Sequence, residues 1–93
     1  MMSKAELEAY RREHPEAAAR ADADRERVSA LLVELLVYEG TDLDQVPDAD
    51  RERVAALVRE LVAEKCVDTD DVAWQVTARG RALLAWRSET RPT

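Results

Sequence analysis

The sequence predicts a small, mainly helical domain that carries one short β-hairpin. Two long segments, residues 24–39 and 49–65, repeat apolar side chains at the spacing of helices. Residues 71–76 instead alternate apolar with polar side chains, which is typical of a half-buried strand. The chain has 93 residues, of which 46% are hydrophobic and 37% charged, and this composition fits one soluble domain with a modest core.

The first 21 residues are predicted to form a helical arm. Ser3 and Glu6 match a capping box, in which the Ser3 hydroxyl accepts from the N–H of Glu6 and the Glu6 carboxylate reaches back. We expect this helix to end near Glu13, because Pro15 disfavours helical geometry at the residue before it.

A short second helix is expected to follow Pro15 through Arg20. The arm offers few apolar side chains, chiefly Leu7 and Tyr10. We therefore expect it to pack on another surface, because it cannot fold alone.

The central helix is predicted over residues 24–39, with Asp22 or Asp24 as its cap and Gly40 at its end. Its apolar side chains lie almost all round the helix, so we expect it to be buried on most sides. They are Val28, Leu31, Leu32, Val33, Leu35, Leu36, Val37 and Tyr38.

A short turn, or a single helical turn capped by Thr41, is expected to lead to Pro47. Asp48 then caps a third helix, from Ala49 to about Lys65. Residues 22–28 recur unchanged as residues 48–54, which we interpret as two helices that start in the same way.

The hairpin is predicted to pair residues 66–68 with a strand over residues 72–76. Thr77 caps a last helix, from Ala78 to about Arg87. The predicted organisation is thus an arm over residues 1–21, a domain over residues 22–88 and a frayed tail over residues 89–93.

Composition excludes several classes of function. Cys66 is the one cysteine, so no internal disulfide forms and no thiol pair has metal-binding spacing. No nucleophile motif or phosphate loop is present, so we expect neither an enzyme nor a cofactor. The polar N-terminus does not resemble a signal peptide, and no apolar run approaches the roughly 20 residues of a membrane helix. We therefore expect a cytoplasmic protein with no membrane segment.

Residues 57–84 resemble the end of winged helix-turn-helix regulators. The resemblance rests on Leu57, Leu61, Val67, a hairpin and the run from Trp74 to Leu84, and the whole pattern covers residues 24–87. It implies a recognition helix over residues 49–65 that enters the DNA major groove, and a wing that touches the backbone. The implied DNA contacts are Arg53, Arg59, Arg79 and Arg81.

Charge departs from that family pattern. The net charge is -6, and carboxylates occupy the positions that would face phosphates. Lys65 also stands where many relatives end the helix with glycine. The carboxylates are Asp48, Asp50 and Glu52 at the start of the recognition helix, and Asp68, Asp70 and Asp71 at the wing.

Two hypotheses remain open from sequence. The first is a homodimeric, DNA-binding transcriptional regulator, with a dimer seam formed by Leu7, Tyr10, Leu83, Leu84 and Trp86. The second is a protein-interaction module that does not bind DNA. In it, Asp68, Asp70 and Asp71 face a basic protein partner, and Ala56 and Ala63 let another helix pack closely. The order of elements favours the first hypothesis and the charge distribution favours the second.

Overall fold

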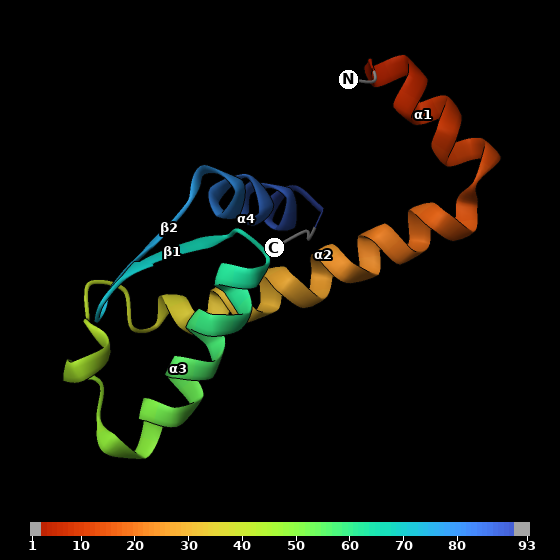
Figure 1. Cartoon of the computed structure of the whole chain (residues 1–93). Helices are drawn as coiled ribbons and strands as arrows, with labels where there is room; N and C mark the ends of the chain where they lie inside the picture. Colours follow the sequence, from red (N-terminus) through yellow and green to blue (C-terminus); the bar gives the residue numbers. More distant parts are fainter. Residues whose placement is uncertain (1–2, 91–93) are drawn as a thin grey trace.

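The computed structural model describes residues 3–90 and confirms a mainly helical chain with a small hairpin (Figure 1). The two strands are antiparallel. Within these residues the elements are α1 (Lys4–Glu13), α2 (Pro15–Leu36), the 3₁₀ turn η1 (Leu43–Gln45), α3 (Asp48–Ala63), β1 (Val67–Asp70), β2 (Ala73–Val76) and α4 (Ala78–Thr90).

The core lies where the C-terminal half of α2 meets α3, the hairpin and α4. Leucines from α2 and α3 fill its centre, and each is at most 1% exposed. Full burial of one such side chain contributes roughly 1.5–3 kcal/mol relative to leaving it in water. These leucines are Leu32, Leu35, Leu57 and Leu61.

The prediction of a separate start for the central helix was wrong. One helix, α2, runs unbroken from Pro15 to Leu36, so Asp22 and Asp24 lie inside it and cap nothing. Neither glycine nor proline interrupts residues 16–36, and alanines favour the helix there. Helix α2 therefore crosses residues 21 and 22, where the predicted arm meets the predicted domain.

The link from α2 to α3 differs from the prediction in its caps. Helix α2 ends at Leu36, three residues early, and Gly40 then takes a positive φ of 81°. Asp42, in place of Thr41, caps η1, since its carboxylate accepts from the backbone N–H of Gln45. Pro47 precedes α3, so Asp48 lies in the first turn of the helix and is not its cap.

The hairpin is longer than predicted in its first strand. Val67 pairs with Val76 and Asp70 with Ala73, and Asp71 turns the chain with a φ of 56°. The indole N–H of Trp74 donates to the carbonyl of Thr41 at 2.9 Å, which fastens β2 to the segment before η1. This contact holds the hairpin against the link between α2 and η1.

Thr77 caps α4 as predicted, because its hydroxyl accepts from the N–H of Gly80. A β-carbon at Gly80 would lie 2.4 Å from the carbonyl oxygen of Cys66, so glycine allows this close approach. Helix α4 continues to Thr90, which makes the first two residues of the predicted tail helical. The rest of that tail, residues 91–93, lies outside the described residues.

The arm projects from the core (Figure 1). Ser3 caps α1 as predicted, and the Glu6 carboxylate accepts from the Ser3 hydroxyl. Helix α1 contains no buried residue. The molecule measures 48 × 27 × 21 Å, and its radius of gyration of 15.6 Å exceeds the roughly 12 Å of a compact domain of this length.

Candidate functional site

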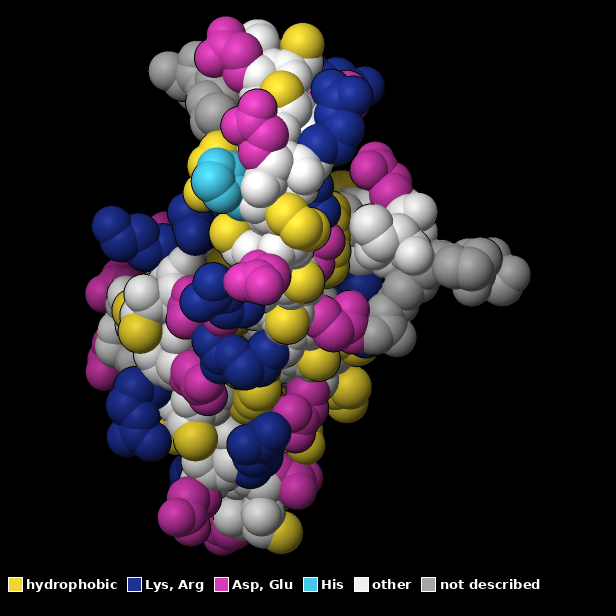
Figure 2. Space-filling model, turned by 90° about the vertical axis from the view of Figure 1, so that its right-hand side faces the viewer, with side chains coloured by type: hydrophobic (Ala, Val, Ile, Leu, Met, Phe, Trp, Pro, Cys, Tyr) yellow, Lys and Arg dark blue, Asp and Glu magenta, His cyan; other side chains and the backbone are white. Residues whose placement is uncertain are grey.

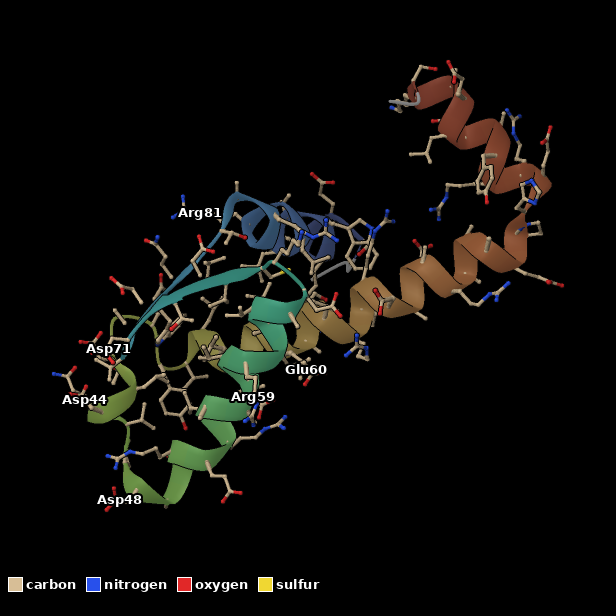
Figure 3. All side chains as sticks on the ribbon, in the orientation of Figure 1. Asp44, Asp48, Arg59, Glu60, Asp71 and Arg81 are labelled. Atoms are coloured by element: carbon tan, nitrogen blue, oxygen red, sulfur yellow. The ribbon has the colours of Figure 1, made fainter. Side chains whose placement is uncertain are left out.

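An acidic edge forms where the turn of the hairpin meets η1. The backbone N–H of Leu43 donates to the carbonyl of Val72 at 2.9 Å, and this bond joins the two loops. Figure 3 shows Asp44 and Asp71 side by side at this end of the molecule, with Asp48 below them at the start of α3. We use the name acidic edge for Asp42, Asp44, Asp48, Asp70 and Asp71.

Little positive charge lies close to the acidic edge. Arg51 pairs with Asp48 at 3.0 Å, but the Asp48 side chain remains 91% exposed. Arg51 also donates to the carbonyls of Asp44 and Val46, which draws it toward the backbone. Neither Asp70 nor Asp71 takes part in an ion pair within residues 3–90. The acidic edge therefore keeps most of its negative charge available to a partner.

A hollow of about 270 Å³ on the hairpin adjoins the acidic edge. Residues that pair across antiparallel strands share a face, so Asp68 and Asp70 lie with Gln75 and Ala73 on the outer side. Opposite Asp70, Ala73 adds only a small side chain to this face. None of the residues that line this hollow is basic. We call it the hairpin hollow.

Arg53, one of the predicted DNA contacts, is exposed but forms an ion pair within the chain. Its guanidinium donates two hydrogen bonds to the Glu34 carboxylate, at 2.9 and 2.7 Å. The pair raises the pKa of Arg53 and holds the pKa of Glu34 below its ordinary value. Arg53 thus fastens α3 to α2.

The other predicted DNA contacts lie on separate surfaces. Figure 3 shows Arg59 on α3 and Arg81 at the start of α4, beyond the hairpin. Arg79 faces the buried thiol of Cys66; burial raises the pKa of that thiol, and Arg79 opposes the rise. On the face shown in Figure 2, basic and acidic side chains are interspersed. Two of the four arginines therefore come from α3 and two from α4.

The residues predicted for a dimer seam are divided between two sides of α4. Leu83 and Trp86 line a groove between α2 and α4, whereas Leu84 lines a hollow beside Leu36 on the other side. Leu7 and Tyr10 are 44% and 43% exposed on α1. The groove and α1 therefore contain four of the five predicted residues.

The two small residues predicted for helix contact share the outer face of α3 with Arg59. Ala56 is half-buried and Ala63 is exposed. Their spacing of seven residues places both on one stripe of the helix.

Sequence reasoning missed the role of Arg87. Its guanidinium donates to the carboxylate of Glu26 and to the hydroxyl of buried Ser29, both at 2.9 Å. These bonds join α4 to α2 across 61 and 58 residues of sequence, so no local sequence pattern could predict them. Arg87 is therefore a structural residue.

No cluster of His, Cys, Asp or Glu within residues 3–90 is arranged to hold a metal ion. In the same part of the chain, no helix combines the length and the apolar character needed to cross a membrane. Comparisons with protein-family models, with curated proteins and with solved structures found no match.

Proposed function

We propose that this chain is a protein-interaction module that binds a basic partner through the acidic edge and the hairpin hollow. The observation that carries the proposal is that the hairpin turn and η1 meet, which gathers carboxylates from three segments into one surface. Such a surface attracts basic partners and repels acidic ones.

The hairpin hollow supports the choice of a basic peptide or protein segment. A lysine or arginine side chain that enters it meets the carboxylates of Asp68 and Asp70, and the Gln75 amide can accept a further hydrogen bond. Charge-assisted hydrogen bonds of this kind are stronger than neutral ones. The acidic edge then adds longer-range attraction, which accelerates association at low salt.

The same surface argues against DNA bound in the winged-helix manner. That mode requires the first turn of α3 and the hairpin turn to approach phosphates. Asp48 and Asp50 occupy the first, and Asp71 occupies the second. Binding to a duplex draws much of its affinity from cations that meet phosphates, and carboxylates there oppose it.

A fluorescent peptide rich in lysine and arginine tests the proposal by anisotropy at low salt. Asp68→Asn plus Asp70→Asn preserves shape and removes two charges, and we expect the dissociation constant to rise about three- to tenfold. Glu13→Gln plus Glu16→Gln is the matched control, because it removes two charges from the arm. An equal effect of both double variants would contradict the proposal, since general attraction would then explain the binding.

The DNA-binding hypothesis keeps one observation in its favour. Arg59 and Arg81 are exposed, and neither takes part in an ion pair within residues 3–90. A low-salt titration with duplex DNA decides between the two functions. Saturable binding by the chain that Arg59→Ala plus Arg81→Ala abolishes would favour DNA and count against the proposed module.

A further inference from the structure

The described part of the arm buries none of its side chains against its own chain. No residue between positions 3 and 27 is buried. Leu7 and Tyr10, one turn apart on α1, remain more than two-fifths exposed. A helix of 10 residues is marginal in water by itself, so α1 needs a surface to cover its apolar side.

A groove between α2 and α4 has the shape and chemistry to receive such a helix. Its first part, of about 440 Å³, has an apolar floor of Val28, Leu83 and Trp86. A second hollow, of about 570 Å³, continues from Trp86 toward the arm. Arg25 lies over the Trp86 ring, 5.9 Å from its centre, where the two parts meet. We call the whole the α2–α4 groove.

The chain's own α1 does not fill this groove. Arg11 of α1 pairs with Asp22 of α2 at 2.7 Å, and both residues line the second hollow. Helix α1 is therefore a wall at the end of the groove, while its Leu7 and Tyr10 stay exposed. A second copy of the chain offers an identical helix, and a two-fold arrangement would satisfy both copies.

We propose that two copies of this chain pair by reciprocal exchange, with α1 of each copy seated in the α2–α4 groove of the other. Leu7 and Tyr10 of one copy then cover Leu83 and Trp86 of its partner. The 10 residues of α1, with 13 further residues that line the groove, fall within the roughly 20–30 residues per partner that a stable interface contains.

The α2–α4 groove and helix α1 each carry charges of both signs. The lining of the groove includes Asp24 and Glu64 as well as Arg25 and Arg79, and α1 has three acidic and three basic residues. The proposal is independent of the proposed function, because the acidic edge belongs to η1, α3 and the hairpin.

Sedimentation equilibrium of the full chain over a concentration series tests the pairing. We expect a measured molar mass twice that of one chain. Leu7→Glu plus Tyr10→Glu should return it to the molar mass of one chain. These residues support no core, so the variant keeps its fold, which thermal unfolding confirms. Ala5→Glu plus Arg12→Gln is the control, because it changes the charge equally on the other side of α1 and should leave the dimer intact. A single monomeric species throughout the series would overturn the proposal.

A photoreactive residue distinguishes exchange from other dimers. With p-benzoylphenylalanine in place of Tyr10, we expect a covalent dimer whose cross-link maps to residues 79–90 of the partner copy. A cross-link that maps only to residues 4–13 of the partner would show pairing between arms and would contradict the exchange.

Discussion

Residues 22–28 and 48–54 have the same sequence, Asp-Ala-Asp-Arg-Glu-Arg-Val, yet they occupy different places in their helices. The first copy lies in the middle of α2 and the second begins α3. Both form the same local ion pair, Arg25 with Asp22 and Arg51 with Asp48. Both end in a buried valine.

The difference teaches that the preceding residue decides whether such a segment starts a helix. Ala21 continues the helix before the first copy, whereas Pro47 lacks an N–H and takes an extended conformation before the second. The acidic first residues suit a helix start but do not force one. In both places the first acidic residue pairs with the arginine three positions later.

The two copies also form equivalent ion pairs between α2 and α3. Arg27 of the first copy pairs with Glu60 at 3.0 Å, and Arg53 of the second pairs with Glu34 at 2.7 Å. Arg27 and Arg53 are equivalent positions of the repeat, as are Glu34 and Glu60. The repeat therefore has a tertiary consequence that the interpretation as two similar helix starts did not include.

The largest expected effect compares the leucines that follow the two copies. Leu57 is 1% exposed, whereas its equivalent Leu31 is only partly buried. We expect Leu57→Ala to lower the free energy of unfolding by about 2–5 kcal/mol, and Leu31→Ala to lower it by less than half as much. Urea denaturation measures both. Equal losses would mean that the two helices are equally enclosed, against the structure.

A smaller effect is expected where the two helices end. Gly40 after α2 and Lys65 after α3 both have positive φ, 81° and 62°, but only glycine takes this conformation without strain. Lys65→Gly should therefore raise the free energy of unfolding by about 1 kcal/mol. Lys65→Ala serves as the control and should bring no such gain; a gain from alanine would locate the effect in the lost charge.

The smallest effect concerns the first acidic residue of the first copy. The hydrogen bond from Arg11, helped by Arg25, holds the pKa of Asp22 below its ordinary value of 3.8. The Arg11–Asp22 pair therefore stabilises the packing of α1 against α2 at pH values above 3.8. This stabilisation is lost as the pH falls through the lowered pKa of Asp22. Because both side chains are more than one-third exposed, we expect less than about 0.5 kcal/mol.

An NMR titration of the Asp22 carboxyl group measures this shift directly. Arg11→Gln should move its pKa back toward the ordinary value, while Arg12→Gln should leave it unchanged. An unchanged Asp22 pKa in the Arg11 variant would show that α1 is not held to α2 by this pair.

Local signals in the sequence predicted the elements well. The Ser3 cap, the break at Pro15, the alternation around Trp74 and the Thr77 cap all depend on residues within a few positions of one another. Such short-range rules identify a helix or strand wherever its neighbours allow it. They failed at Asp22, where the sequence offers a good cap but no reason to stop the helix before it.

The sequence by itself determined the mainly helical class, the hairpin, the helix caps at Ser3 and Thr77 and the excess of negative charge. Only the tertiary structure decided that Glu34 neutralises Arg53, that Arg87 joins α4 to α2, and that carboxylates from three segments meet beside Val72. The physical reason is the distance along the chain between the residues that interact. Caps and periodicity arise between residues close in sequence, whereas these ion pairs and surfaces depend on how helices and strands distant along the chain pack together.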